Sequence, residues 1–89
     1  MNERLKHELI ALFGRGRVEQ AEITDVADLE LTAELMDAVH DAAEAILKRL
    51  GQPSRQREIV DNLDAETALV LCMWLMDTDF ANTVYGAAA

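Results

Sequence analysis

The chain has 89 residues, of which 51% are hydrophobic, and it carries a formal net charge of −9 at pH 7. Its length suffices for one small domain, and its hydrophobic share excludes a disordered chain. The acidic charge argues against direct binding to nucleic acid or to anionic membranes, because both need cations on the protein to replace counterions. A single cysteine, Cys72, excludes a disulfide framework within one chain and cannot build a zinc site alone.

The composition, rich in alanine, leucine and glutamate, favours helices and leaves few candidates for strands. The predicted fold class is therefore all-α, a compact bundle of four to five short helices. We expect one domain over residues 1–89, with 86–89 as a frayed tail. The N-terminus has no signal-peptide pattern, and no apolar run approaches the roughly 20 residues that span a bilayer. A cytoplasmic protein is the expectation.

The first predicted helix covers residues 3–13, where Leu5, Leu9 and Leu12 recur at helical spacing. Residues 14–17 read Gly-Arg-Gly-Arg and are predicted to form a loop. Residues 18–23 are compatible with a helical turn or with an extended linker.

Thr24 is predicted to cap the next helical piece, because threonine side chains accept hydrogen bonds from the first free N–H groups of a helix. Beyond it, two apolar rows advance in steps of three and four. The first row is Val26, Leu29, Ala33, Met36, His40, Ala43, Leu47 and Leu50, and the second is Leu35, Val39, Ala42 and Ile46. Together they predict a helix that packs on two neighbours. One helix over 25–50 and a break at Thr32 both fit, and we favour a long helix over 33–50 after a shorter piece.

The C-terminal half contains two further predicted helices, 55–63 with Ser54 as its cap and 65–77 with Asp64 as its cap. Residues 68–76 are apolar without interruption, which also fits a buried strand, but the preceding Asp-Ala-Glu-Thr is a helix-start pattern. We expect helix 65–77 to lie at the centre of the bundle and to be covered on every side. Because so short a chain can barely supply that cover, a second subunit or a partner could complete it. Phe80, Val84 and Tyr85 could form a last amphipathic turn.

Acidic residues dominate the middle of the chain, where positions 19–44 contain nine Asp or Glu residues and no Lys or Arg. Their spacing places several carboxylates on one face of the long helix, where like charges repel. One interpretation is a negative ridge that imitates a phosphate backbone and binds a basic protein surface; the other is a solvated face that confers solubility. The candidate partner-binding residues are Glu30, Glu34, Asp37, Asp41 and Glu44.

Metal and catalytic sites have weaker signals. Asp37 and His40 have the spacing of one ligand pair, but a di-iron bundle needs two such units, and His40 lies on the apolar row, where a partly buried imidazole is expected. The sequence therefore predicts no catalytic residues, metal or cofactor.

One alternative comes from two acid pairs, Glu19 with Glu22 and Glu34 with Asp37. In these pairs the chain resembles the all-α nucleotide pyrophosphohydrolases of the MazG type. The resemblance implies that the four carboxylates hold Mg²⁺ against nucleotide phosphates.

The predicted function is that of a small acidic protein-binding module, an inhibitor or regulator that docks its acidic helix on a basic, nucleic-acid-binding surface of a partner. Size and charge are of the type found in regulators encoded by mobile elements, including anti-CRISPR proteins. The alternatives are a Mg²⁺-dependent pyrophosphohydrolase and a structural homodimer.

Overall fold

The computed structural model describes residues 3–77. They form helices α1 (Glu3–Phe13), α2 (Arg15–Ile23), α3 (Ala33–Leu47), α4 (Pro53–Asp61) and α5 (Ala65–Met76), with a 3-10 turn, η1 (Val26–Asp28), before α3. No strand occurs among these residues, so the prediction of an all-α bundle of short helices is confirmed. The predicted turn at residues 80–85 and the tail at 86–89 lie outside the described residues.

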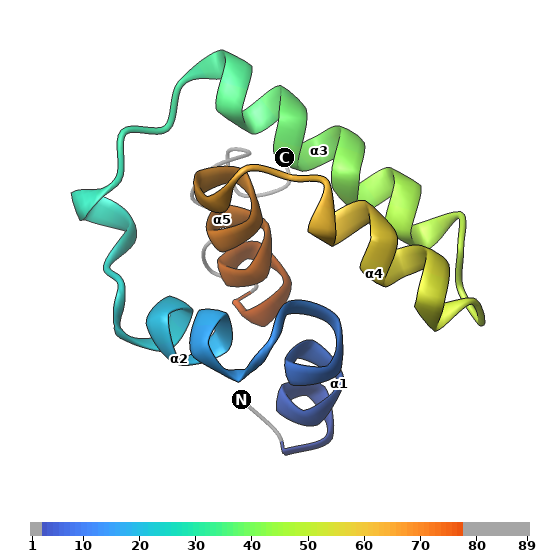
Figure 1. The fold of residues 1–89 in the computed structure, drawn as a ribbon. Helices are drawn as coiled ribbons and strands as arrows, with labels where there is room; N and C mark the ends of the chain where they lie inside the picture. Colours follow the sequence, from blue (N-terminus) through green and yellow to red (C-terminus); the bar gives the residue numbers. More distant parts are fainter. Residues whose placement is uncertain (1–2, 78–89) are drawn as a thin grey trace.

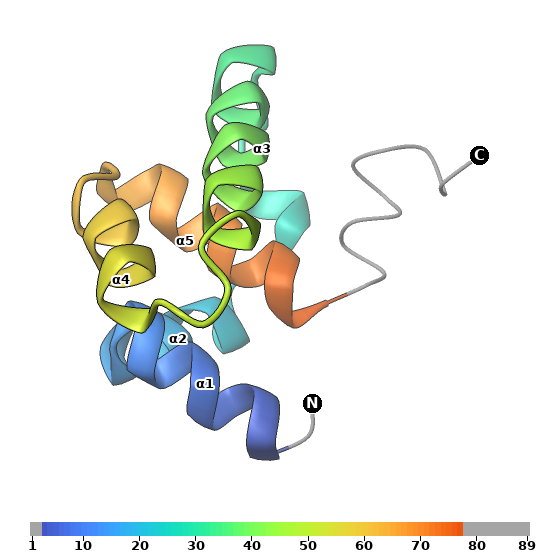
Figure 2. The same cartoon turned by 90° about the vertical axis from the view of Figure 1, so that its right-hand side faces the viewer.

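Helix α5 occupies the centre of the bundle, as predicted, and contacts α1, α2 and α3 (Figures 1 and 2). Helix α4 lies outside this arrangement and packs against α1 and α3. All five helices contribute buried side chains to one hydrophobic cluster. At its centre Val70, Leu71 and Cys72 have no exposed surface, because neighbours surround the middle turns of α5.

Within residues 3–77 the middle turns of α5 are covered on every side, whereas cover of its last turn by a second subunit or a partner stays a prediction. Leu75 is 36% exposed, and Trp74 and Met76 are only half-buried. The described neighbours enclose the middle of the helix but do not reach around its C-terminal end. Apolar surface therefore remains open to solvent at this end of the core.

Helix α2 corrects the predicted loop at residues 14–17. Only Gly14 interrupts the chain, with a φ of +93°, a value that favours glycine, and the next helix starts at Arg15. Val18 and Ala21 are buried in the core, and α2 contacts α5. Burial of this face stabilises a helix that the glycine-rich sequence did not predict.

Thr24 ends α2 and does not cap a following helix, contrary to the prediction. Its hydroxyl and its backbone N–H both donate to the carbonyl oxygen of Gln20, at 2.7 and 3.1 Å. Asp25 takes the capping role for η1, where its carboxylate accepts from the N–H of Ala27 at 3.0 Å.

Helix α3 begins after Thr32, whose hydroxyl accepts from the N–H of Leu35 at 3.1 Å. The favoured break at Thr32 is therefore correct, but the helix ends at Leu47 and not at residue 50. Gly51, with a φ of +80°, turns the chain toward α4. The second apolar row faces the core together with Ala43 of the first row, while Leu47 and Leu50 of the first row are 64% and 70% exposed.

Helix α4 starts two residues earlier than predicted, because Pro53 occupies its first turn and Gln52, not Ser54, precedes it. The side-chain amide of Gln56 donates to the carbonyl oxygen of Ile46 at 3.0 Å and ties α4 to α3.

Asp64 caps α5 as predicted: its carboxylate accepts from the N–H of Thr67 at 2.7 Å. Hydrogen bonds from the side chain and the backbone of Thr67 lower the pKa of Asp64. Within residues 3–77, none of these helices combines the length and the apolar character needed to cross a membrane.

Candidate protein-binding surface

The outward side of α3 carries a row of carboxylates, here called the acidic face and defined as Glu34, Asp37, Asp41 and Glu44. All four residues are exposed. The helical period explains this placement, because Leu35, Val39, Ala42 and Ile46 lie on the opposite side and pack into the core. The structure therefore brings four of the five predicted partner-binding residues together on one rigid element.

Glu30, the fifth predicted residue, is exposed but lies in the loop between η1 and α3. It precedes the cap residue Thr32 and so is not part of the helical row. Glu30 therefore lies outside the acidic face.

The charge of the acidic face is largely uncompensated. Glu44 forms an ion pair with Lys48, at 3.3 Å between carboxylate and ammonium. Among residues 3–77, no Lys or Arg lies within ion-pairing distance of Glu34, Asp37 or Asp41. Like charges three or four residues apart repel by some tenths of a kcal/mol per pair, so the row costs stability.

His40 lies beside this face and not in the core, contrary to the expectation of a partly buried imidazole. It is exposed, and its ring stacks on that of Trp74, with centroids 6.5 Å apart and 28° between the planes. This contact joins residues on two helices far apart in the sequence, and no local pattern could have predicted it.

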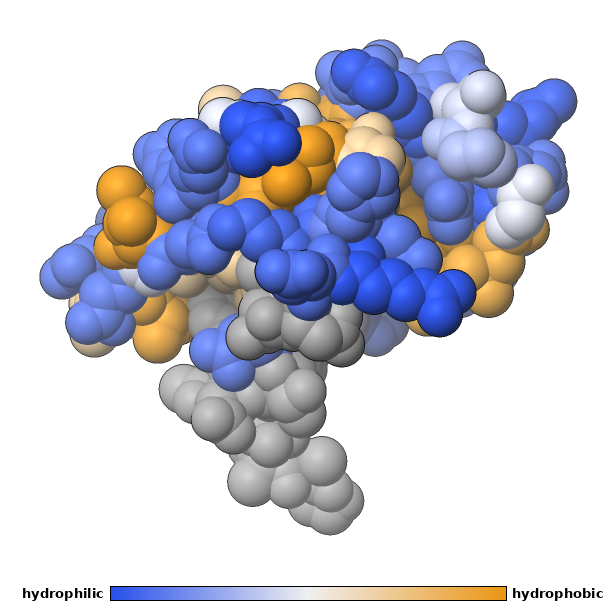
Figure 3. Space-filling model, turned by 90° about the horizontal axis from the view of Figure 1, so that it is seen from below, coloured by the Kyte–Doolittle hydropathy of each residue, from blue (hydrophilic) through white to orange (hydrophobic). Residues whose placement is uncertain are grey.

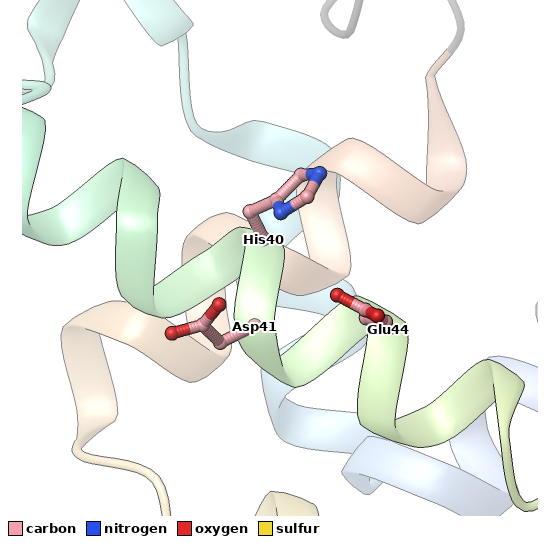
Figure 4. A group of neighbouring side chains, drawn as sticks. All are labelled: His40, Asp41 and Glu44. Carbon is pink, nitrogen blue, oxygen red and sulfur yellow. The ribbon is translucent and has the colours of Figure 1, made fainter.

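His40, Asp41 and Glu44 form the one cluster of potential metal ligands found within residues 3–77 (Figure 4). Their ligand atoms lie within 4.8 Å of one another, but all three residues are exposed and come from successive turns of α3. The ion pair with Lys48 also occupies the carboxylate of Glu44. Such an open cluster, with water on one side, can hold a divalent cation only weakly. Asp37, the ligand that the sequence paired with His40, is not part of it.

The two acid pairs of the pyrophosphohydrolase alternative are not brought together. Glu19 and Glu22 lie on α2 and Glu34 and Asp37 on α3, and α5 packs between these helices (Figure 1). Glu22 is also held by Lys6, at 3.0 Å between ammonium and carboxylate. The described geometry therefore gives no support to a shared Mg²⁺ site.

Cys72, the only thiol in the sequence, is fully buried in α5. Burial raises its pKa to about 11, although the positive charge of Arg17 opposes the shift. Because the thiolate is the reactive form, this environment disfavours nucleophilic chemistry. Cys72 therefore acts as a small hydrophobic core residue.

We expect thiol labelling to demonstrate this burial. At pH 8 the raised pKa alone should slow the reaction of native Cys72 with a disulfide reagent by about two orders of magnitude relative to the unfolded chain. Comparing labelling rates without denaturant and in strong denaturant tests the prediction. Equal rates would show that the thiol is accessible in the folded protein.

Among residues 3–77, the surface carries an exposed row of carboxylates on α3, whereas the thiol of Cys72 is buried. Lys48 neutralises one end of the acidic face, and its spacing of four residues from Glu44 is an ion-pair signal that the sequence contains. Comparison with known proteins finds no matching family model, no similar curated protein and no similar solved structure.

Proposed function

We propose that the protein is a small acidic binding module, an inhibitor or regulator, which docks the acidic face of α3 on a basic surface of a partner protein. One observation carries the proposal: Glu34, Asp37 and Asp41 stand exposed in a row, without a Lys or Arg partner among residues 3–77. A helix with a purely structural role gains stability when lysines alternate with its acids. Here the cation is supplied at only one end of the row, by Lys48.

The dimensions of the row suit a surface that otherwise holds nucleic acid. Residues 34–44 advance by about 15 Å along the helix axis, so four carboxylates follow one another at intervals of about 5 Å. Phosphates along one strand of DNA present a comparable line of negative charge. Arginine and lysine side chains that bind phosphates also bind carboxylates, through charge-assisted hydrogen bonds.

The net charge of −9 would assist this docking in a second way. A strongly acidic body is attracted to a basic partner before contact, which raises the association rate. Basic protein surfaces thus become preferred partners, while nucleic acids and anionic membranes are repelled.

Affinity capture at two ionic strengths tests the proposal. The immobilised protein should retain a basic protein from a nuclease-treated lysate at about 0.1 M salt and release it near 1 M, where the Debye length falls to about 3 Å. Nuclease treatment removes nucleic acid that could bridge two proteins. Retention that is equal at both salt concentrations would contradict electrostatic docking.

A further inference from the structure

A second surface, formed by none of the residues of the acidic face, contains a pocket of about 470 Å³ between α1, the α3–α4 turn and the end of α5. Its walls are mainly apolar and include five leucines and the proline that starts α4: Leu5, Leu9, Leu12, Leu50, Leu75 and Pro53. Leu50 is 70% exposed and Leu75 is 36% exposed, so the pocket is open to solvent. On the side of the molecule that lies below in Figure 1, hydrophobic patches interrupt the hydrophilic surface (Figure 3).

The wall formed by the α3–α4 turn is the most basic part of the chain. Residues 49–57 contain three of its eight Lys and Arg residues and no acid, and these are Arg49, Arg55 and Arg57. The preceding Lys48 is paired with Glu44 of the acidic face and is not counted with them. Arg55 and Arg57 are exposed and form no ion pair with any described residue. The opposite wall, α1, is balanced, because Arg4 lies 3.9 Å from Glu8, the charged residue among those that line the pocket. The basic residues do not themselves line the pocket, but they lie in the same segment as its lining residues Leu50, Pro53 and Gln56. This basic segment, residues 49–57, is here called the cationic edge.

We propose that this pocket binds an acidic amphipathic helix of another protein, with apolar side chains inserted among the leucines and carboxylates facing the α3–α4 turn. Helix-in-groove recognition uses such a combination of apolar anchors and flanking charges. A second copy of the chain fits less well, because it would present the same cationic edge and its net charge of −9 repels another copy. The pocket and the acidic face would then bind partners of opposite charge.

The two surfaces make the protein a candidate adaptor. The acidic face selects a basic surface, while the pocket selects an acidic helix through its leucines and through Arg57, which is adjacent in sequence to the lining residue Gln56. Because the surfaces are formed by different residues, the pocket proposal does not depend on the proposed function. Either surface can fail without the other.

Fluorescence anisotropy with designed peptides tests the pocket. The probe is a labelled amphipathic peptide of about 16 residues, or about 24 Å as a helix, with leucines at helical spacing and glutamates on both flanks. The matched peptide has lysines in place of the glutamates. We expect the full chain to bind the acidic peptide and to bind the lysine peptide at least about tenfold more weakly, as a few flanking charges can supply.

Matched variants assign this binding to the pocket. Leu50→Ser should weaken binding of the acidic peptide about tenfold, whereas Leu47→Ser should leave it unchanged, because Leu47 is also exposed but does not line the pocket. Similarly Arg57→Glu should weaken binding, whereas Arg15→Glu on α2 should not. All four side chains are exposed, so the variants should remain folded.

Three outcomes would overturn the proposal: preference for the lysine peptide, binding of neither peptide, or equal losses with Leu47→Ser and Leu50→Ser. Self-association that Leu50→Ser abolishes would assign the pocket to a second copy and would also reject it. Variants of the acidic face should bind the acidic peptide at least as well as the unmodified protein does, because they repel it less. Failure of one surface is therefore distinguishable from failure of the other.

Discussion

Replacement of Leu71 by alanine should lower the free energy of unfolding by roughly 2–5 kcal/mol. Leu71 lies in the middle of α5, has no exposed surface and belongs to the cluster to which all five helices contribute. Alanine would remove a buried isobutyl group and leave a cavity that the surrounding helices fill only in part. For a domain of this size the total stability is about 4–13 kcal/mol, so Leu71→Ala should consume a large share of it. Urea unfolding followed by circular dichroism measures the loss.

Leu75→Ala is the matched control, because it changes the same residue type on the same helix. Leu75 is 36% exposed at the open end of α5, so its removal should cost well under half as much as that of Leu71. Equal losses at both positions would show that the two ends of α5 are packed alike. That result would contradict a central helix with an open last turn.

The triple reversal Glu34→Lys, Asp37→Lys and Asp41→Lys should weaken partner binding by at least about a hundredfold, because like charges brought together at an interface cost several kcal/mol. Each substitution raises the net charge of −9 by two. Helicity should persist, since the three side chains are exposed and lysine is a good helix former. Isothermal titration with the captured partner measures the affinity, and circular dichroism checks the fold.

A second triple variant separates the acidic face from the overall charge. Glu19→Lys, Glu58→Lys and Asp61→Lys alter net charge equally but lie on α2 and α4, where their side chains are exposed. Binding by this variant should fall only a few-fold, through weaker long-range attraction. If both triple variants lose the same affinity, the carboxylates of α3 serve solubility and do not form a docking surface.

Helix ends could be predicted from the sequence where a capping residue or a glycine marks them. Gly14 follows the end of α1 with a positive φ, and the side chains of Thr32 and Asp64 accept hydrogen bonds from N–H groups at the starts of α3 and α5. These effects depend on near neighbours in the sequence and not on distant helices. Thr24 and Ser54 show the limit of such signals. Both types of side chain can cap a helix, but Thr24 instead donates back to Gln20, and Pro53 starts α4 before Ser54 can act.

Most of the acidic face was also visible in the sequence, since the helical period alone places Glu34, Asp37 and Asp41 on one side of a helix. The pocket could not be predicted from the sequence. Its leucines come from three separate parts of the chain, and they meet only because α1 and the α3–α4 turn pack beside the end of α5.

The sequence by itself determined that this protein is helical, acidic and built around the apolar run of residues 68–76, because helix propensity, capping and charge depend on near neighbours. Only the tertiary structure decided that the end of the first apolar row, Leu47 and Leu50, is exposed while the second row is packed in the core. It also decided that His40 stacks on Trp74 and that Leu50 and Leu75 share a pocket. The local sequence does not show which of two adjacent apolar rows on a helix will be buried. Contact with α4 and α5 selects between them, because burial depends on helices that lie far away in sequence.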